Sequence, residues 1–415
     1  MKILQINKFY PPHLGGVETI VKDITDGLNS RIGFEIDVLV CESPADTQSR
    51  TDNSHQTDNN GLPKTSGRIY RAASRFKILG MPLSLDFFRL FFKLVKNYDA
   101  LFFHHPFPLA FLVMPFLKNK KIFIWYHSDI IRQKIGRLIF RPFIRLGLKK
   151  AIKIFVSGAA LPANSRLLKK YAAKCVIIPF GLPDRFFSLT IDSQICNAAQ
   201  NEKNNTLIQT EKDSSAPEED SSAPGIEEKN IAAQIQEIRH RYGAPLILSV
   251  GRLVYYKGFK YLIRALAGSS YHLLIIGAGP ERKRLNKEIK KIGLEKQVMI
   301  LPPVPDLIPY YLASDLFVLS SCAASEAYGI VQAEAMACGR PIINTSLPTP
   351  AREVNEDGRT GLTVPPKNPV ALRRAIDTIM NDANLRRRYG TAAKEKAGRE
   401  FTRTGFLDKL EKYLN

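Results

Sequence analysis

The sequence predicts an α/β protein made of two Rossmann-like domains that face a cleft. Its 415 residues are enough for two or three domains. Short apolar runs alternate with segments of helical spacing in both halves, the pattern of parallel sheets covered by helices. A polar, acidic segment at about 188–232 separates the two blocks.

The first block predicts an N-terminal domain over residues 1–182. Its first strand is expected at Ile3–Ile6, followed by a glycine-containing turn and a helix at Val17–Leu28. Further short apolar runs predict the remaining strands, at 36–40, 100–103, 122–125 and 152–156.

The most apolar part of this block is Leu101–Leu117, which two histidines and three prolines interrupt. A spanning helix needs about 20 apolar residues, so no transmembrane helix is expected. The N-terminus does not have the pattern of a signal peptide. The five cysteines show no metal-ligand spacing, which favours a reduced, cytoplasmic location.

The segment 183–243 is predicted to be a linker that contains a flexible acidic insert at about 188–232. Two near-copies of Asp-Ser-Ser-Ala-Pro, at 213–217 and 220–224, fall within it. Little apolar surface is available there to offset the entropy of ordering the chain.

The second block predicts a C-terminal domain over residues 244–392. Its strands are expected at 246–250, 272–276, 298–301, 316–319 and 341–344. Helical spacing predicts helices at 258–267, 280–292, 306–313, 329–338 and 368–381. Residues 393–415 are expected to form helices that pack back towards the N-terminal domain.

The net charge of +21 favours an anionic partner: nucleic acid, a phosphorylated small molecule or an anionic membrane surface. The charge is +16 over residues 1–182, −6 over 183–232 and +11 over 233–415. The sequence shows no module that interleaves basic residues with stacking aromatic ones, so nucleic acid is the weakest of these candidates.

Two loops at strand ends have features of anion-binding sites. Gly15 and Gly16 lie between the first strand and the first helix, where the backbone can approach a ligand closely. Arg252 and Lys257 follow the first strand of the second domain and could clamp a phosphate. Each loop alone is also compatible with an ordinary turn. A third loop, Gly277–Glu281, lacks the full dinucleotide-binding fingerprint.

The most specific segment runs from Ser325 to Pro341. Glu326 lies in the loop after a strand, and Glu334 lies eight residues on, about 12 Å along the following helix. Gly329 at the helix start leaves backbone N–H groups free for an anion. Two carboxylates suit a ligand with several hydroxyl groups, and a glutamate within a largely apolar helix is expected to have a partner.

The order Gly-Gly-Val-Glu, Gly-Arg-Leu…Lys-Gly and Glu-x7-Glu before Glu-Ala-Met-Ala-Cys-Gly-Arg-Pro resembles the family 4 retaining glycosyltransferases, which have the glycosyltransferase-B fold. The resemblance covers nearly the whole chain except about 188–232. Asp357–Val364 also matches a pattern of the family. Ser320-Ser321 and Tyr328 are mild departures, and the acidic insert is atypical.

The resemblance implies a role for each matched residue. Arg252 and Lys257 would hold the diphosphate of a nucleotide sugar, and Glu334 would bind the ribose. Glu326 would contact the transferred sugar, helped by the backbone of Tyr328, Gly329 and Ile330. Gly15 and Gly16 would approach donor or acceptor. Without the resemblance, His127 is typical of a structural histidine. The resemblance implies that His127 lies beside the donor sugar.

The resemblance further implies retention of anomeric configuration by front-side attack, so Glu326 is not assigned as a nucleophile. No Asp-x-Asp motif is present, which predicts that no metal or other cofactor is needed. The segment His127–Lys134 resembles envelope-polysaccharide mannosyl and rhamnosyl transferases. This favours GDP-mannose as donor and a saccharide acceptor that is carried on a lipid diphosphate.

Two alternative functions remain. A nucleotide-sugar epimerase of the same fold would need no acceptor, and a basic nucleic-acid-binding protein is more remote.

The segment 130–150 has two interpretations of its own. Basic residues recur in it every four positions, opposite the apolar residues Ile135, Leu138, Ile139, Phe143 and Leu146. This stretch either lies on an anionic membrane or packs its apolar face into the core, and Pro142 is expected to divide it into two helices.

Overall fold

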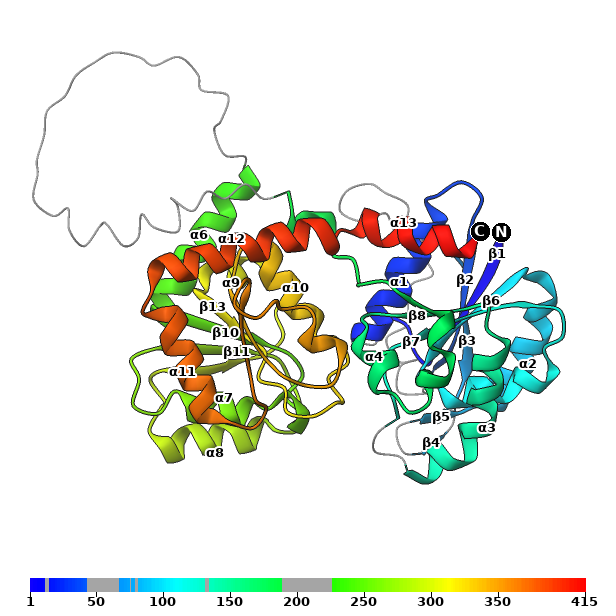
Figure 1. Cartoon of the computed structure of the whole chain (residues 1–415), viewed down its shortest axis with the longest axis horizontal. Helices are drawn as coiled ribbons and strands as arrows, with labels where there is room; N and C mark the ends of the chain where they lie inside the picture. Colours follow the sequence, from blue (N-terminus) through cyan, green and yellow to red (C-terminus); the bar gives the residue numbers. More distant parts are fainter. Residues whose placement is uncertain (12–14, 43–66, 75, 79–80, 131–133, 189–225) are drawn as a thin grey trace, which may run out of the picture. The chain divides into compact units, whose positions relative to one another are not determined.

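The computed structural model describes residues 1–11, 15–42, 67–74, 76–78, 81–130, 134–188 and 226–415. These residues form two compact units (Figure 1). The N-terminal unit consists of Met1–Gly181, Pro348–Pro350 and Arg403–Asn415. The C-terminal unit consists of Leu182–Leu347 and Ala351–Thr402.

The N-terminal unit is built on a seven-stranded parallel sheet in the order β3-β2-β1-β6-β7-β8-β9. The strands are β1 (Lys2–Ile6), β2 (Glu35–Glu42), β3 (Ile69–Ala73), β6 (Ala100–His105), β7 (Lys121–Tyr126), β8 (Lys153–Val156) and β9 (Cys175–Ile177). A short antiparallel pair, β4 (Phe76–Ile78) and β5 (Met81–Leu83), lies outside this sheet.

The helices of this unit are α1 (Gly16–Asn29), α2 (Leu85–Leu94), α3 (Lys134–Lys150), α4 (Ala160–Asn164) and α13 (Arg403–Leu414), with 3-10 segments η2 (Val95–Asn97), η3 (Pro108–Phe116) and η4 (Leu168–Lys174). The side chain of Ser84 caps α2 by accepting a hydrogen bond from the Phe87 amide. On the last helix, Asp408 and Glu411 form ion pairs with Arg31, which follows α1. The C-terminal residues are thereby joined to the first helix of the chain.

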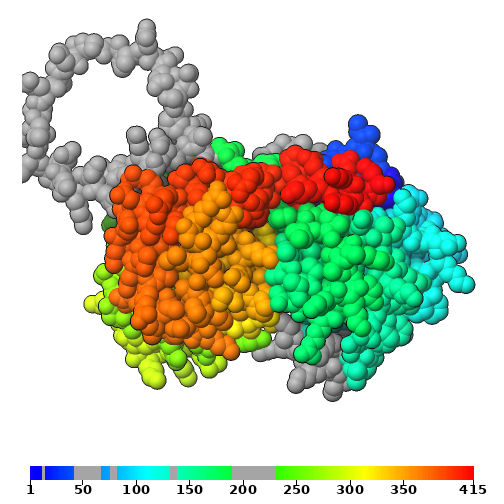
Figure 2. Space-filling view, in the orientation of Figure 1, coloured from blue at the N-terminus to red at the C-terminus, as the bar shows by residue number. Residues whose placement is uncertain are grey.

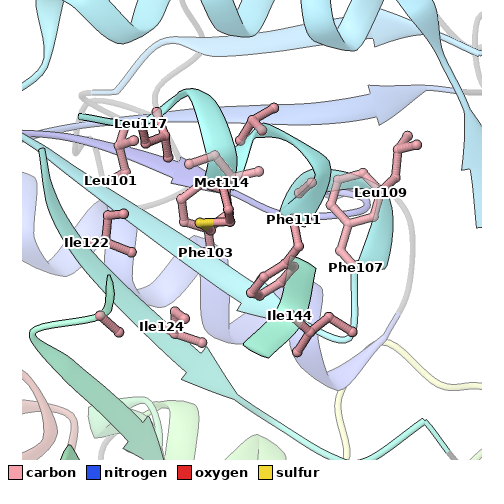
Figure 3. Packing of buried hydrophobic residues seen from close by; sticks show 14 of the residues in the cluster. Leu101, Phe103, Phe107, Leu109, Phe111, Met114, Leu117, Ile122, Ile124 and Ile144 are labelled. Atoms are coloured by element: carbon pink, nitrogen blue, oxygen red, sulfur yellow. The ribbon is translucent and has the colours of Figure 1, made fainter. Parts of the chain in front are cut away.

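The apolar stretch Leu101–Leu117 forms β6 and η3 in the core of this unit (Figure 3). Phe103, Phe111 and Met114 are fully buried, together with Ile124 of β7. The histidines and prolines that interrupt the run mark where the strand ends and the 3-10 turns begin. Among the residues that the structure describes, no helix combines the length and the apolar character needed to cross a bilayer.

The C-terminal unit is built on a six-stranded parallel sheet in the order β12-β11-β10-β13-β14-β15. The strands are β10 (Leu246–Val250), β11 (His272–Ile276), β12 (Val298–Leu301), β13 (Leu316–Val318), β14 (Ile342–Thr345) and β15 (Gly361–Val364). Both sheets therefore confirm the predicted α/β fold class.

The helices of this unit are α6 (Ile226–Tyr242), α7 (Phe259–Ala265), α8 (Arg282–Ile292), α9 (Ile308–Ala313), α10 (Ile330–Ala337), α11 (Pro369–Met380) and α12 (Ala383–Glu400). Its 3-10 segments are η5 (Asp184–Phe186), η6 (Tyr255–Lys257) and η7 (Pro350–Arg352). The first residue of η7 belongs to the N-terminal unit. Asn368 and Asp382 cap α11 and α12 through their side chains. The surfaces of α11 and α12 appear in orange in Figure 2.

Two features differ from the sequence-based expectation. Residues 226–232, assigned above to the flexible insert, lie in α6, and the rest of the insert from 189 on lies outside the described residues. The expected boundary at 392/393 falls inside α12.

The prediction that Pro142 divides the segment 130–150 is wrong, because α3 continues through it. A proline inside a helix removes one backbone hydrogen bond, and the packing of the second half of α3 compensates for that loss. Ile144 and Leu148 are buried, and Gly147 lies so close to the Phe111 ring that a Cβ there would approach it to 2.7 Å.

The predicted apolar face of α3 packs on the core only in part. Phe143 and Leu146 pack against the core, whereas Leu138 is 71% exposed and Ile139 is 59% exposed. The side chains of residues 131–137, Ile135 and Arg137 among them, lie outside the described residues.

Candidate active site

Strand order places the candidate residues of the C-terminal unit together. The order of the sheet reverses between β10 and β13, which are hydrogen-bonded neighbours although β11 and β12 separate them in sequence. The loops after two such strands form the usual ligand site of an open parallel sheet. Here the loop after β10 carries Arg252 and Lys257, and the loop after β13 carries Glu326.

Lys257 and Glu326 form a buried ion pair in which the Lys257 Nζ lies 2.7 Å from the Glu326 Oε2. The two side chains are 11% and 7% exposed. The Ser321 hydroxyl also donates to the Glu326 Oε2, at 2.7 Å. Both contacts use one carboxylate oxygen, so Oε1 accepts no hydrogen bond from the described residues.

The two loops are joined by close backbone contacts. Ser320 Oγ donates to the Lys257 carbonyl at 3.0 Å, and the Cys322 amide donates to the Tyr256 carbonyl at 2.7 Å. Gly258 follows Lys257 with φ +68°, and a Cβ there would lie 2.0 Å from the Ser320 carbonyl oxygen. Only glycine fits this position, which holds Lys257 against Glu326.

Glu334 lies on α10, where its Oε2 accepts a 2.6 Å hydrogen bond from the buried Tyr311 hydroxyl. Burial raises the pKa of Glu334, and the Tyr311 hydrogen bond and the charge of Lys257 oppose that rise. Lys257 therefore acts electrostatically on both glutamates. Among the described residues, the Glu334 Oε1 accepts no hydrogen bond.

Gly329 directly precedes helix α10 as its N-cap, and its φ of +68° is left-handed. A Cβ there would lie 2.8 Å from Leu319 and 3.6 Å from the Glu326 Oε1. Tyr328 is buried, and Ile330 is the first helical residue. The amides at the start of a helix have no partner within it, so an anion near Glu326 would meet N–H donors here.

Helix α10 is fixed by a buried amide pair that the sequence did not single out. Asn344 Nδ2 donates to the Gln332 Oε1 at 3.0 Å and to the Ala351 carbonyl at 3.0 Å. The Thr363 hydroxyl donates to the Asn344 Oδ1 at 2.8 Å. These bonds join α10, β14 and β15 and so fix the helix that carries Glu334.

Arg252 is exposed and forms no ion pair with a described residue. Its charge still reaches the site. Burial and the Glu326 carboxylate raise the pKa of Tyr256, and the charges of Lys257 and Arg252 oppose the rise. The site thus contains two cations: Lys257, which is already paired with Glu326, and Arg252, which is free to bind an anion.

The candidate residues of the N-terminal unit lie at strand ends of its own sheet. Gly16 begins α1, and Gly15 precedes it with an extended backbone. A Cβ on Gly15 would lie 2.2 Å from a Glu18 carboxylate oxygen, whereas nothing lies within 4 Å of one on Gly16. Residues 12–14 of this loop lie outside the described residues.

His127 follows β7 and ends a buried chain of hydrogen bonds. Its Nε2 lies 3.1 Å from the His104 Nδ1, and the His104 Nε2 lies 2.8 Å from the Gln5 Oε1. Gln5 in turn donates through Nε2 to the Thr25 hydroxyl at 2.8 Å.

This chain assigns the protons of both histidines. The Gln5 Oε1 only accepts, so the His104 Nε2 carries the proton. Burial lowers the pKa of His104 to about 3, which leaves its Nδ1 bare and able to accept from the His127 Nε2. Burial and the neighbouring histidines hold the pKa of His127 well below its usual value. At neutral pH the His127 Nδ1 is therefore a hydrogen-bond acceptor.

These histidines predict an acid-sensitive N-terminal unit. Burial also lowers the pKa of His105 to about 3, so between about pH 6.5 and 3 His104 and His105 bind protons only after unfolding. His127, whose pKa is lowered as well, acts in the same direction. Stability is then present above pH 6.5 and lost as the pH falls, and His104 and His105 each lower the free energy of unfolding by about 1 kcal/mol at pH 5.5. Asp23, whose pKa burial raises to about 6, opposes this, leaving a net loss of about 2 kcal/mol between pH 7 and 5.5.

The single tryptophan, Trp125, stacks on His127 with ring centroids 5.9 Å apart, so its fluorescence reports the unfolding of this unit. Urea titrations at pH 7 and 5.5 measure the loss. His105→Phe should reduce the loss by about 1 kcal/mol. A free energy of unfolding that does not change over this range would contradict the proton assignment.

The structure thus places the predicted residues in two groups. The C-terminal unit brings together Arg252, Lys257, Glu326, Tyr328, Gly329, Ile330 and Glu334, and the N-terminal unit holds Gly15, Gly16 and His127. Sequence reasoning missed the partners that orient them: Ser321, Tyr311, Gln332, Asn344, Gln5 and His104. The available signals were polar residues in apolar strands and a tyrosine in an apolar helix.

Two family models match the chain. Residues 14–183 match Glycosyltransferase Family 4, and residues 230–396 match Glycosyl transferases group 1. Over 412 residues the chain is 26% identical to O-antigen chain mannosyltransferase C of Escherichia coli, covering 98% of this chain and 96% of the relative. It is also 26% identical to the D-rhamnosyltransferase WbpZ of Pseudomonas aeruginosa, covering 97% and 92%.

Solved structures show the same fold. The Anabaena protein HepE in complex with UDP aligns with a TM-score of 0.72 at 18% identity, covering 100% of this chain and 99% of that one. Sucrose-phosphate synthase of Thermosynechococcus elongatus aligns with a TM-score of 0.72 at 20% identity, covering 100% and 98%.

Proposed function

Because the chain belongs to the family 4 glycosyltransferases of the glycosyltransferase-B fold, we propose that it transfers mannose from GDP-mannose to a lipid-linked saccharide during synthesis of an envelope polysaccharide. The observation that carries this proposal is the similarity to an O-antigen mannosyltransferase and a D-rhamnosyltransferase along more than nine-tenths of each chain.

In this proposal, Arg252 and Lys257 bind the diphosphate of the donor. Lys257 has three N–H donors and uses one of them on Glu326, so two remain for phosphate oxygens. Exposed Arg252 adds a fork of donors. Negative charge develops on the diphosphate as the anomeric bond breaks, and these cations stabilise it without a metal or other cofactor.

The two glutamates bind the hydroxyl groups of the donor. The unused Oε1 of Glu326 accepts from the transferred sugar, and that of Glu334 accepts from the ribose. The backbone of Tyr328, Gly329 and Ile330 positions the sugar and the nearest phosphate. In the N-terminal unit, His127 accepts from a sugar hydroxyl through Nδ1, and Gly15 and Gly16 approach donor or acceptor.

Glu326 is poorly suited to act as a nucleophile because Lys257 and Ser321 already stabilise its negative charge. We therefore favour front-side attack with retention of configuration. The acceptor hydroxyl forms the new bond to the anomeric carbon as the bond to the diphosphate breaks. Its proton passes to the departing phosphate oxygen.

A panel of nucleotide sugars tests the donor assignment. Purified protein is incubated with GDP-mannose, UDP-glucose or other donors, with and without a saccharide on undecaprenyl diphosphate, and with EDTA in a parallel set. We expect GDP release to require the acceptor and to persist in EDTA. Turnover with another donor alone would reject GDP-mannose. Conversion of the donor without acceptor would indicate an epimerase.

We also propose that α3 associates with an anionic membrane surface. Leu138 and Ile139 are exposed on α3, and the basic side chain of Lys149 is exposed further along the helix. Each basic residue near such a surface contributes about 1 kcal/mol, and insertion of the two apolar side chains adds to that. This proposal places the enzyme peripherally on the cytoplasmic face.

Flotation with vesicles tests the membrane proposal. Replacing Leu138 and Ile139 together by serine should reduce binding to vesicles containing anionic lipid by about tenfold, because about 1.4 kcal/mol or more of apolar transfer is lost. The exposed Val370 in the C-terminal unit offers a control, since Val370→Ser should bind as the wild type does. Equal flotation of the double variant would contradict the role of α3.

A further inference from the structure

The N-terminal unit contains a cavity of about 380 Å³ that none of the roles above uses. His105 ends β6 and Tyr126 ends β7, so the cavity lies at the carboxyl ends of two neighbouring strands. It is lined by His105, Tyr126, Asp129, Ile130, Arg141, Ile144, Asn164, Arg166 and Leu167. Its volume falls within the range of small-molecule sites.

The cavity lies on the opposite face of the sheet from the His127 network. Alternate residues of a strand point to opposite faces, so His104 and His105 point in opposite directions. His104 bonds to His127, whereas His105 stacks on Tyr126 with ring centroids 4.3 Å apart. The two adjacent histidines therefore serve different sites.

His105 is 1% exposed, and neither of its ring nitrogens has a hydrogen-bond partner among the described residues. Burial lowers its pKa to about 3, so the ring is neutral and offers one donor and one acceptor. A buried polar group without a partner is costly, and the lining of a cavity is where a bound molecule can provide one.

The charged groups of the lining favour an anion that also bears hydroxyl groups. Arg141 and Arg166 form no ion pair with any described residue. The Asp129 Oδ1 accepts from the Tyr126 hydroxyl at 2.5 Å and from the Ser165 hydroxyl at 2.8 Å. The carboxylate is thus fixed by one oxygen, and the other remains available to accept from a ligand hydroxyl.

We propose that this cavity binds the phosphorylated sugar of the acceptor, with the phosphate on Arg141 and Arg166 and sugar hydroxyl groups on His105 and Asp129. This inference rests on the proposed transferase function and adds the acceptor's recognition. Ile130, Ile144 and Leu167 provide apolar walls for the sugar ring.

Calorimetry on the full chain tests the site with mannose 1-phosphate as the probe and methyl α-mannoside and inorganic phosphate as comparisons. We expect Arg141→Gln and Arg166→Gln each to weaken mannose 1-phosphate binding by 10-fold or more, since each removes a charge-assisted bond. Arg89→Gln, an exposed arginine of α2, is the matched control. Lys257→Ala should retain this binding, which excludes attachment at the donor site.

Steady-state kinetics distinguish a lipid headgroup from a free sugar phosphate as the source of the phosphate. The acceptor's KM should rise 10-fold or more in both arginine variants, with a lipid-linked and with a water-soluble phosphorylated acceptor, while the donor's KM is unchanged. A rise in KM with the lipid-linked acceptor alone would indicate that the two arginines act at the membrane surface and would overturn the proposed site.

An unchanged acceptor KM in a wild-type-like fold, verified by circular dichroism, would also overturn the site. So would equal binding of methyl α-mannoside and mannose 1-phosphate. If the wild type transfers no sugar at all, the transferase proposal fails instead, and the calorimetric comparison still decides whether the cavity binds a sugar phosphate.

Discussion

Lys257→Ala should lower kcat/KM for sugar transfer by about 10²- to 10⁴-fold. The substitution removes two charge-assisted contacts to the donor diphosphate, each worth about 1.5–3 kcal/mol, where charge develops in the transition state. It also leaves Glu326 buried beside Ser321 without its cation. Steady-state rates at saturating acceptor measure the effect.

Stability has to be separated from catalysis in this variant. Removing one partner of a buried pair costs about 3–5 kcal/mol, so Lys257→Ala alone could lose activity through unfolding. The double variant Lys257→Met with Glu326→Gln removes both charges and should fold more stably than the single variant while staying inactive. Lys290→Ala, on the exposed surface of α8, is the charge control. Transfer at the wild-type rate by a folded Lys257→Ala protein would exclude the proposed role.

Glu326→Ala should lower kcat/KM by about 10²-fold, with the loss tied to the hydroxyl groups of the transferred sugar. A carboxylate that accepts a hydrogen bond from a hydroxyl contributes about 1.5–3 kcal/mol, and Lys257 loses its positioning partner at the same time. Deoxy analogues of the donor identify the hydroxyl. The transfer rate of the wild type should fall when that hydroxyl is missing from the donor. The rate of Glu326→Ala, which no longer contacts the hydroxyl, should fall little further with the same deoxy donor.

The matched control is Glu295→Ala, which removes an exposed carboxylate of the same unit. If every deoxy donor reduces the rate of Glu326→Ala by the same factor as that of the wild type, the carboxylate does not contact the sugar. Its role would then be limited to the ion pair with Lys257.

Periodicity located the first three strands of the C-terminal unit because they are short, largely apolar runs. β10, β11 and β12 have the predicted bounds, and every residue of β10 is buried. β15 was not predicted, since Gly361–Val364 reads as part of a glycine-rich motif. Its pairing with β14 is decided by the tertiary structure. Pro142 was misjudged for a similar reason, because propensity gave no information on the packing of α3.

The site was predictable as a set of residues but not as a set of contacts. Lys257 and Glu326 are 69 residues apart, and they meet because β10 and β13 are neighbours, which no local pattern reveals. His104 and Gln5 were missed because they lie within buried strands, where a polar residue reads as an interruption of the core. The cavity beside His105 depends on which face of β6 each histidine occupies, and that alternation is fixed only once the strand's register is known.

The most direct test of the proposed chemistry is transfer of labelled mannose from GDP-mannose to a saccharide on undecaprenyl diphosphate, with wild type, Lys257→Ala and Lys290→Ala measured side by side. We predict that wild type and Lys290→Ala form a labelled lipid-linked product with the anomeric configuration of the donor, and that Lys257→Ala forms at most about one per cent as much. Equal product from all three proteins, or product of inverted configuration, would contradict the assignment of the Lys257–Glu326 site.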